Sequence, residues 1–370
     1  MIRALHLASG DLWAGAEAQV YQLLCALREQ PDVRVSAITF NHGELERRLR
    51  AADITVTVLD ERTLSSRGIL QGILSEIKAT DATVLHTHRL KENILGSIAA
   101  RLSRRAISLR TVHGRPEHAG KGPARMRLVR AIDSLAGRLQ SGIVGVSDEL
   151  CDFLRTRFPS GKVFCVPNGI DSATIIRAAA LRCSYQAQRQ KNVALVGRLV
   201  PVKRVDLFLE AAALLTRKYP GEYRFVVVGD GPLREEMIAL AERLGIRGDV
   251  EFLGFQSNSL GILKQMDCLA LTSDHEGLPM VLLEALTLGV PVVAHAVGGL
   301  PEVLAGVAGQ RLVTEHTAAG YAEAIAGLVG RHSPEEPLQE RQSLLPPRFE
   351  ISGTASQYAD LYRRLAQHNS

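Results

Sequence analysis

Residues 273–293 read SDHEGLPMVLLEALTLGVPVV, and this stretch carries the strongest pattern in the chain. The apolar run Cys268–Ser273, which leads into it, is typical of a buried strand. Pro279 then stands where a helix can begin, because the first helical position needs no backbone N–H and suits the fixed φ of proline. The stretch therefore predicts a strand, a loop and a helix in direct succession.

Two glutamates stand eight positions apart in this stretch, at 276 and 284. Glu276 falls on the loop at the carboxyl end of the strand, and Glu284 falls inside the helix, more than a turn beyond its start. The free N–H groups of the helix start lie between them, and such groups attract phosphate. An anion site flanked by two hydrogen-bond acceptors suits a phosphorylated sugar. The pair alone is also compatible with a capped helix and two solvated glutamates.

The composition is that of a globular protein with sizeable cores. The chain has 370 residues, of which 46% are hydrophobic, and this length allows about two or three domains. No apolar run reaches the ~18 residues of a membrane span, and the N-terminus lacks the pattern of a signal peptide. The five cysteines are odd in number and widely spaced, so we expect no disulfide or cysteine metal site and a reducing, cytoplasmic setting.

Positive charge is concentrated in one segment. The net charge is +5, but the segment Arg101–Arg138 holds ten basic residues against two acidic ones. Such a face can meet an anionic membrane surface or another polyanion, and it can equally be a solvated helical surface. Aromatic residues make up only 5% of the chain and no nucleic-acid-binding motif is present, so we expect no nucleic acid partner.

Apolar runs alternate with amphipathic segments along both halves of the chain. In the first half, expected strands such as Ile2–Ala8 and Thr83–His88 are separated by helical patterns such as Asn93–Leu102. The second half repeats this style from Val193–Gly197 to Pro291–Ala296. Strand–helix alternation predicts parallel sheets covered on both faces. The expected fold class is therefore α/β, with two doubly wound, Rossmann-like domains.

The expected domain boundary follows the turn signal at residues 167–169, Pro-Asn-Gly. It gives an N-terminal domain over residues 1–168, a C-terminal domain over residues 169–347 and a final helix over residues 348–370. The segment Ser333–Pro347 carries four prolines and is typical of a linker. Open α/β sheets bind ligands at the carboxyl ends of their strands, so two such domains would face each other across a deep cleft.

Several side chains with binding chemistry stand at expected strand ends. His113 can donate to substrate oxygens, titrate near neutral pH or be purely structural. Arg198 and Lys203 share one loop before a helix, where they can neutralise a diphosphate or be ordinary surface charges. The small residues around Gly15 allow a ligand to approach the backbone closely, although a glycine-containing turn is common without one.

Two other kinds of site are not supported. His86 and His88 could belong to a metal site, but no third ligand is evident in the sequence. The Gly229-x-Gly231 turn has Arg234 where the dinucleotide fingerprint needs a third glycine, so we expect the turn only to close a strand onto a helix. No Asp-x-Asp sequence is present to hold a divalent metal on a sugar nucleotide.

Taken in order, these motifs resemble the retaining glycosyltransferases of family four, which have the GT-B fold. The resemblance covers almost the whole chain and is strongest in VGRLVPVKRVDLFLEA from residue 196, VVVGDGPLREEM from 226 and EGLPMVLLEALTLGVPVVAHAVGGLPEVL from 276. In the first half, GAEAQ, HTH, TVHG and VPNGID fall in the expected order. Many relatives read EGFG where this chain reads EGLP, a variant that keeps both glutamates and bears on the fine donor contacts.

The resemblance implies that the C-terminal domain holds a nucleotide-sugar. Arg198 and Lys203 would bind its diphosphate. Glu284 would accept hydrogen bonds from the ribose hydroxyls, and Glu276 would contact hydroxyls of the donor sugar. The other implied donor-binding positions are backbone groups at the helix start and the surroundings of the base, namely Gly277, Leu278, Met280, Phe252 and Leu253.

In the N-terminal domain, the resemblance implies that Gly15 approaches the diphosphate, that His113 binds the sugar, and that the acceptor lies on this side. The final helix would cross back to this domain. The implied reaction retains configuration and needs no metal or other cofactor, because Arg198, Lys203 and the helix dipole stabilise the departing nucleoside diphosphate. A UDP-sugar is slightly favoured as donor.

The sequence therefore predicts a glycosyltransferase that moves a hexose-type sugar from a nucleotide-sugar to a sugar or lipid-linked acceptor. The expected setting is the synthesis of a surface polysaccharide or glycolipid, in the cytoplasm or peripherally on the inner membrane face. A sugar-nucleotide epimerase on the same fold and a non-catalytic scaffold subunit remain as alternatives. The donor base, the sugar and the acceptor stay open.

Overall fold

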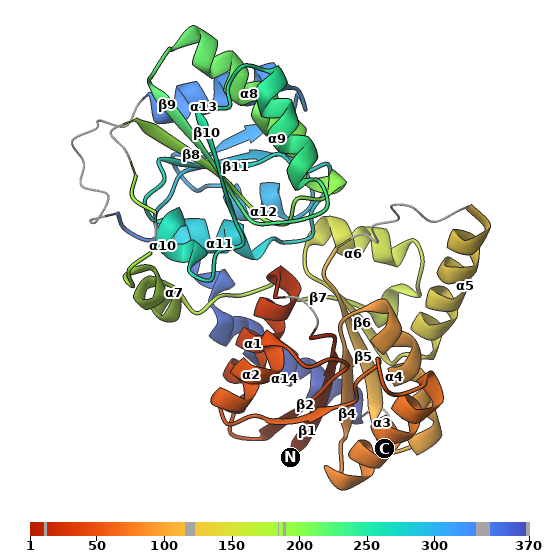
Figure 1. Ribbon diagram of the computed structural model, residues 1–370. Coiled ribbons are helices and arrows are strands. Elements are labelled where there is room, and N and C mark those ends of the chain that lie inside the picture. The colour runs from red at the N-terminus through yellow and green to blue at the C-terminus, as the bar shows by residue number, and fades with distance from the viewer. Residues whose placement is uncertain (11–12, 115–122, 184, 188–189, 331–340, 368–370) are drawn as a thin grey trace. The chain divides into compact units, whose positions relative to one another are not determined.

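The computed structural model describes the chain except for residues 11–12, 115–122, 184, 188–189, 331–340 and 368–370, and except for the side chains of residues 123–130. The chain divides into two compact units (Figure 1). The first comprises Met1–Gly169 with Arg348–Ser370, and the second comprises Ile170–Pro347.

The first unit is built on a parallel sheet of seven strands in the order β3-β2-β1-β4-β5-β6-β7. The strands are β1 (Ile2–Ala8), β2 (Val33–Thr39), β3 (Thr55–Val58), β4 (Val84–Thr87), β5 (Ile107–Val112), β6 (Gly142–Gly145) and β7 (Val163–Cys165). The intervening helices are α1 (Gly15–Arg28), α2 (Glu44–Ala51), α3 (Ser66–Ala79), α4 (Leu90–Ser103), α5 (Pro123–Leu139), α6 (Asp148–Arg155) and the 3-10 helix η1 (Ser160–Lys162).

Side-chain alternation along the strands gives this sheet an apolar core on each face. Leu5, Leu7 and Leu85 lie in the cluster that includes residues of α3 and α4. Ala4 and Val84 lie in a separate cluster with residues of α1 and of the last helix, α14 (Ile351–Gln367). The predicted return of the final helix to the first unit is therefore confirmed, and α14 lies beside α1 in Figure 1.

The second unit has a parallel sheet of six strands in the order β10-β9-β8-β11-β12-β13. The strands are β8 (Lys191–Val196), β9 (Tyr223–Val228), β10 (Val250–Gly254), β11 (Cys268–Leu271), β12 (Val292–His295) and β13 (Arg311–Val313). Its helices are α7 (Ser172–Ala179), α8 (Val205–Lys218), α9 (Arg234–Arg243), α10 (Ser259–Leu263), α11 (Met280–Thr287), α12 (Leu300–Leu304) and α13 (Ala318–Val329), with the 3-10 helix η2 (Pro201–Lys203). A further 3-10 helix, η3 (Pro347–Phe349), begins at the last residue of this unit. The predicted α/β class with two Rossmann-like sheets is confirmed.

Local details near the expected helix starts differ from the sequence prediction. Pro279 does not begin α11 but precedes it as the N-cap, with φ of −72°, so the helix starts at Met280. Lys203 ends η2, and Arg204 follows with a left-handed φ of 47° before α8 begins at Val205. Most of the predicted linker at 333–347 lies outside the described residues.

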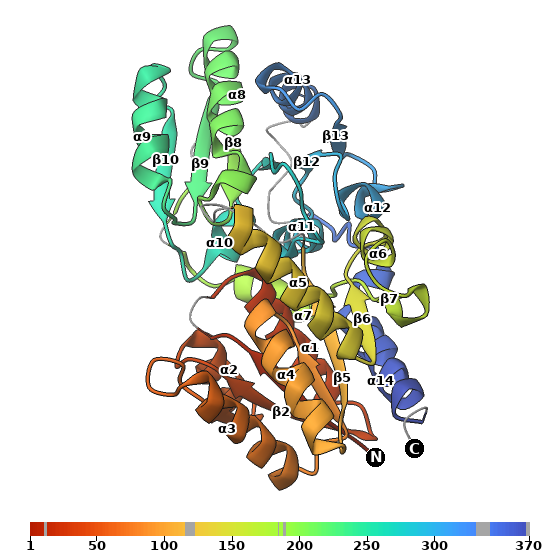
Figure 2. The ribbon, with the colours of Figure 1, turned by 90° about the vertical axis from the view of Figure 1, so that its right-hand side faces the viewer.

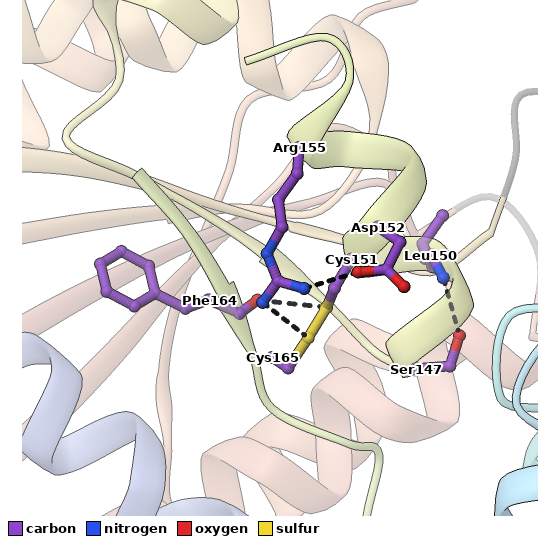
Figure 3. The surroundings of a disulfide bond; sticks show 7 residues. All are labelled: Ser147, Leu150, Cys151, Asp152, Arg155, Phe164 and Cys165. Atoms are coloured by element: carbon purple, nitrogen blue, oxygen red, sulfur yellow. Dashed lines mark hydrogen bonds and ion pairs between the residues drawn. A yellow bond between two sulfur atoms is a disulfide. The ribbon is translucent and has the colours of Figure 1, made fainter. Parts of the chain in front are cut away.

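The expectation of no disulfide is wrong. Cys151 in α6 and Cys165 at the end of β7 are bonded, with their Cα atoms 6.0 Å apart (Figure 3). Arg155 lies beside this disulfide and pairs with Asp152 at 2.7 Å (Figure 3). The bond ties α6 to the last strand of the first sheet, a contact that residue spacing alone does not reveal. Among the helices that the structure describes, none combines the length and apolarity needed to cross a membrane.

Candidate active site

At the carboxyl edge of the second sheet, two loops bring a cation and a carboxylate together. Lys203 Nζ lies 2.5 Å from Glu276 Oε1, and the two side chains are only 23% and 11% exposed. The Ser273 hydroxyl donates to the same carboxylate oxygen at 2.6 Å. A ligand that carries both phosphate and hydroxyl groups could separate these two side chains. The ammonium group of Lys203 suits a phosphate anion, and the carboxylate of Glu276 accepts hydrogen bonds from hydroxyls.

The loop that carries Glu276 is fixed by the neighbouring loop after β12. Gly298 has a left-handed φ of +59°, and a Cβ there would lie 2.1 Å from the Glu276 carbonyl oxygen. The N–H of Gly299 donates to the Gly277 carbonyl at 2.7 Å. His295 Nδ1 contacts the Ser273 carbonyl oxygen at 2.8 Å, which adds a third tie. The Glu276 backbone is therefore held in place by close packing that only glycine permits at 298.

Glu284 lies in α11, just over one turn after its start, and is half-buried. Burial raises the pKa of its carboxyl group to about 7. Its side chain has no ion pair or hydrogen bond within the described part of the chain, so its oxygens are available as acceptors. Gly277, Leu278 and Met280 are buried around the helix start, where no side chain caps α11.

The remaining predicted donor residues occupy separate places in the second unit. Arg198 is exposed after β8, and no described residue forms an ion pair or hydrogen bond with its guanidinium group. Phe252 and Leu253 are half-buried on β10, which β9 separates from β8. The structure thus brings Lys203 and Glu276 together and leaves Phe252 and Leu253 two strands away from β8.

The glycine turn after β9 packs against the loop after β8. A Cβ at Gly229 would lie 2.0 Å from the Gly197 carbonyl oxygen, and a Cβ at Gly231 would lie 2.5 Å from that of Leu199. The Leu199 N–H also donates to the Asp230 carbonyl at 3.0 Å. Because they have no Cβ, these glycines allow the backbones of the two loops to touch. This agrees with the expectation that the turn closes a strand onto a helix.

Sequence reasoning missed a second polar cluster at the same edge. Asp274 Oδ1 accepts from Arg204 at 3.1 Å and contacts His316 Nε2 at 3.0 Å. The ring of His316 stacks on that of His295 with centroids 3.8 Å apart. These residues come from four different loops, and the only signal in the sequence is that each stands at a strand's carboxyl end.

In the first unit, Gly15 is the first residue of α1 and is exposed, as a close approach of a ligand requires. His113 follows β5, and its Nε2 atom lies 3.2 Å from His88 Nδ1. Its Nδ1 atom is buried and has no hydrogen-bond partner among the described residues. Burial, aided by the charge of Arg89, lowers the pKa of His113 to about 4, so the ring is neutral at pH 7.

His86 and His88 have a third imidazole nearby, which is not evident in the sequence. His6 on β1 stands opposite His86 in the parallel register, and ligand atoms of the three rings lie within 4.8 Å of one another. The ring nitrogens of these three histidines, however, already form hydrogen bonds. His86 contacts the Tyr362 hydroxyl at 2.6 Å through Nδ1 and the Thr111 hydroxyl at 2.8 Å through Nε2.

The basic segment divides into a buried part and an exposed part. Arg110 is 2% exposed and pairs with Asp133 at 2.7 Å, so it does not belong to a basic surface. The exposed cations lie near the ends of α4 and α5, which pack side by side (Figure 2). The exposed described side chains there are Arg101, Leu102, Arg104, Arg105, Ile132, Leu135, Arg138 and Leu139. The other basic side chains of the segment lie outside the described residues.

Both halves of the chain match known protein families. Residues 182–341 match the family described as Glycosyl transferases group 1, and residues 13–174 match Glycosyltransferase Family 4. The chain is 31% identical over 198 residues to alpha-D-kanosaminyltransferase of Streptomyces kanamyceticus, across 53% of this chain and 51% of that protein. It is 27% identical over 233 residues to UDP-Gal:alpha-D-GlcNAc-diphosphoundecaprenol alpha-1,3-galactosyltransferase of Escherichia coli, across 60% of each. The chain thus spans about half to three fifths of these relatives' length.

Solved structures resemble the chain over nearly its whole length. The Anabaena protein HepE in complex with UDP and glucose has a TM-score of 0.81 at 21% identity, covering 98% of this chain and 100% of that one. Sucrose-phosphate synthase of Thermosynechococcus elongatus has a TM-score of 0.76 at 17% identity, covering 100% of both. At this level of identity the likeness concerns the fold, which is GT-B.

Proposed function

Because the chain belongs to the family-four glycosyltransferases, we propose that it transfers a sugar from a nucleotide-sugar donor to an acceptor. The observation that carries this proposal is the Lys203–Glu276 pair at the carboxyl edge of the second sheet, with Glu284 in the helix that follows. A nucleotide-sugar can be bound by these groups, because a cation binds its phosphates and two carboxylates accept hydrogen bonds from its hydroxyl groups. The two relatives are named as sugar transferases, and this supports the same reaction class.

In this proposal the ion pair between Lys203 and Glu276 breaks when the donor binds, and Lys203 binds the diphosphate of the donor instead. Lys203 and Arg198 then stabilise the negative charge that grows on the leaving diphosphate. Glu276, released from its ion pair, accepts hydrogen bonds from hydroxyls of the donor sugar. The N–H groups around Gly277 and Met280 assist at the sugar and phosphate.

The ribose and base contacts are proposed to lie beside this centre. Glu284 accepts hydrogen bonds from the ribose hydroxyls in a largely desolvated setting, which strengthens such bonds. Leu278 contributes at the helix start, and Phe252 and Leu253 pack near the base. A UDP-sugar is slightly favoured because one relative's name begins with UDP-Gal and a structural neighbour is a complex with UDP.

We further propose that the reaction retains configuration and needs no metal. The bond from the anomeric carbon to the diphosphate breaks, and the acceptor oxygen attacks from the same face. The acceptor's proton passes to the departing phosphate oxygen. Arg198, Lys203 and the start of α11 balance the charge that a metal balances in other transferases. The ligand contacts predicted for His113 and Gly15 in the first unit stay predictions.

The acceptor is proposed to be a sugar or a lipid-linked sugar, in surface polysaccharide or glycolipid synthesis. Two observations support a peripheral position on the inner membrane face. Exposed arginines and exposed leucines alternate at the ends of α4 and α5, with Leu102 60% and Leu135 59% exposed. One relative's name also includes a diphosphoundecaprenol-linked sugar. Basic and apolar side chains together suit an anionic lipid surface.

A donor panel tests the proposal directly. UDP-, GDP- and ADP-sugars are added to the purified chain, and we expect one class to raise the unfolding temperature, because a ligand that binds the native state stabilises it. The donor so identified is then incubated with and without candidate acceptors. Sugar transfer only in the presence of an acceptor supports the proposal. Conversion of the donor alone would identify an epimerase, and donor binding without turnover would identify a non-catalytic subunit.

A further inference from the structure

A chain of hydrogen-bonded rings and hydroxyls crosses the interior of the first unit between the sheet and α14. It begins at His113, at the carboxyl edge of the sheet, passes through Tyr362 of the last helix and ends at Tyr358 of the same helix. The register of the strands brings the groups together: His6 on β1 stands opposite His86 on β4, and His88 follows two residues later on the same face. In order, the members are His113, His88, His6, Tyr362, His86, Thr111 and Tyr358.

Every link in this chain is within hydrogen-bonding distance. His113 Nε2 and His88 Nδ1 are 3.2 Å apart, and His88 Nε2 and His6 Nδ1 are 3.1 Å apart. The Tyr362 hydroxyl lies 3.3 Å from His6 Nε2 and 2.6 Å from His86 Nδ1. Two further links complete the chain, from His86 Nε2 to Thr111 Oγ1 at 2.8 Å and from Thr111 Oγ1 to the Tyr358 hydroxyl at 2.7 Å.

The four imidazoles of the chain are neutral at pH 7. Burial lowers the pKa of His6 to about 3 and that of His113 to about 4, and it lowers the pKa values of His86 and His88 well below their ordinary range. A neutral imidazole has one N–H donor and one acceptor nitrogen, and each hydroxyl has one proton. The direction of the bond on one side of a ring therefore fixes the direction on its other side, whereas a hydroxyl can also accept from both sides.

Four arrangements use every link. Four N–H and three O–H protons serve the six contacts, so one proton is left over. It stays at an end of the chain, or on Tyr362 or Thr111 if that hydroxyl accepts from both of its neighbours. If the donors point toward His113, all four rings carry the proton on Nδ1, and the spare donor is His113 Nδ1–H. If they point toward Tyr358, all four rings carry it on Nε2, and the spare donor is the Tyr358 O–H.

The surroundings of the two ends differ. Tyr358 is 2% exposed among the apolar side chains of α14 and the sheet, and its hydroxyl has no second hydrogen-bond partner among the described residues. A spare O–H on Tyr358, Tyr362 or Thr111 would stay buried and unsatisfied, which is costly. His113 lies at the strand ends where open α/β sheets bind ligands. Its Nδ1 atom is also buried and has no partner among the described residues, so in the first arrangement a ligand oxygen that reaches Nδ1 would satisfy the spare donor.

We propose that Tyr358 and Tyr362 of the last helix are positioning residues that set the tautomer of His113, so that His113 presents an Nδ1–H donor to an oxygen atom of the ligand. This inference rests on the proposed function for the identity of that ligand. Of the two buried tyrosine hydroxyls of the last helix, that of Tyr362 contacts His6 and His86, and that of Tyr358 contacts Thr111.

The direct test needs no substrate. Nitrogen-15 NMR of histidine-labelled protein at pH 7.5 distinguishes protonated from unprotonated ring nitrogens. We expect His6, His86, His88 and His113 all to carry the proton on Nδ1, with no metal bound. Protons on Nε2, or different tautomers in different rings, would overturn the proposal. So would one equivalent of zinc in the purified protein that disappears in His6→Ala, because a metal would replace the hydrogen bonds.

A kinetic test uses Tyr362→Phe, which removes one hydroxyl from the middle of the chain. We expect His113 to show a mixture of tautomers and kcat/KM for sugar transfer to fall about tenfold, as for the loss of one well-placed hydrogen bond. Tyr185→Phe is the matched control, since its buried hydroxyl donates to Asn192 in the second unit at 3.0 Å. The control should lose stability but keep kcat/KM.

The two tests separate the possible failures. An unchanged kcat/KM and an unchanged His113 tautomer in Tyr362→Phe would overturn the positioning role. If the parent protein shows no sugar transfer with any donor, the proposed function fails, while the NMR result still decides whether the chain orients His113.

Discussion

At the residue scale, the site depends on carboxylates in two different environments. Glu276 pairs with Lys203 and accepts a hydrogen bond from the Ser273 hydroxyl. Glu284 has no such partner among the described residues, and burial raises its pKa to about 7. The two glutamates that appear equivalent in sequence are therefore chemically distinct, as different roles at a sugar and a ribose would require.

The raised pKa of Glu284 predicts pH-dependent donor binding. The ionised carboxylate is the form that accepts from two ribose hydroxyls, so below pH 7 a proton must leave before the donor binds. We expect the Kd for a nucleotide-sugar to rise roughly tenfold per pH unit below pH 7 and to level off above pH 8. Calorimetric titration from pH 5.5 to 8.5 measures this. Glu284→Gln should bind more weakly and lose the dependence. Equal affinity at all pH values in the parent protein would contradict the assignment.

The buried histidines predict a loss of stability in mild acid. Their pKa values are lowered in the folded state, so unfolded rings take up protons below pH 6.5 that the folded rings do not, and the free energy of unfolding falls as the pH falls. The raised pKa values of Glu92 and Glu284 act in the opposite direction over this range. We expect a net loss of about 2–4 kcal/mol between pH 6.5 and pH 5.

Urea unfolding at a series of pH values tests this expectation. A free energy of unfolding that stays constant from pH 6.5 to pH 5 would show that the four rings are not buried as neutral groups.

At the element scale, strands and long helices could be predicted from the sequence, but the loops between them could not. Helix α8 can be read from the sequence because its apolar residues recur with a regular period. Lys203 and Arg204 precede it, and the left-handed φ of Arg204 is not visible in that pattern. The Asp274 cluster and the meeting of His6 with His86 depend on which strands are neighbours, and periodicity carries no such information.

The Cys151–Cys165 disulfide is the clearest case of this kind, because it joins two elements separated by η1. Closing a loop of about 15 residues is worth roughly 3 kcal/mol. We expect Cys165→Ser to lower the free energy of unfolding by about 2–3 kcal/mol in oxidising buffer, with little further effect of a reductant. Denaturant unfolding with and without dithiothreitol measures this. Cys183→Ser, at a cysteine outside the disulfide, should keep the effect of the reductant. If the reductant leaves the free energy of unfolding of the parent protein unchanged, the disulfide does not contribute to stability as expected.

At the scale of the whole molecule, the ordered motifs allowed the two-sheet fold, the family and the return of the last helix to be predicted. They did not reveal how the basic segment is divided. Arg110 counted as part of a basic face, whereas the structure buries it against Asp133. The direction of each side chain on β5 decides whether Arg110 is buried or exposed. A count of charges along the sequence does not give that direction.

The exposed ends of α4 and α5 predict binding to anionic lipid. We expect the protein to float with vesicles that contain anionic lipid and not with neutral vesicles, and to dissociate as salt rises, since surface attraction is screened. Arg101→Glu combined with Arg104→Glu should weaken flotation at least tenfold. Arg217→Glu combined with Lys218→Glu, at exposed positions at the end of α8 in the second unit, is the matched control. Equal binding to both kinds of vesicle would remove the basis for membrane attachment.

The central claim is that the carboxyl edge of the second sheet holds a nucleotide-sugar and drives its transfer. The most direct measurement is the rate of sugar transfer by Lys203→Ala and by Glu276→Ala, each shown by circular dichroism to remain folded. Lys218→Ala, an exposed lysine at the far end of α8, serves as control. We expect kcat/KM to fall by about 10²–10³ in the first two variants and to stay unchanged in the control. Near-native transfer by either Lys203→Ala or Glu276→Ala would contradict the claim.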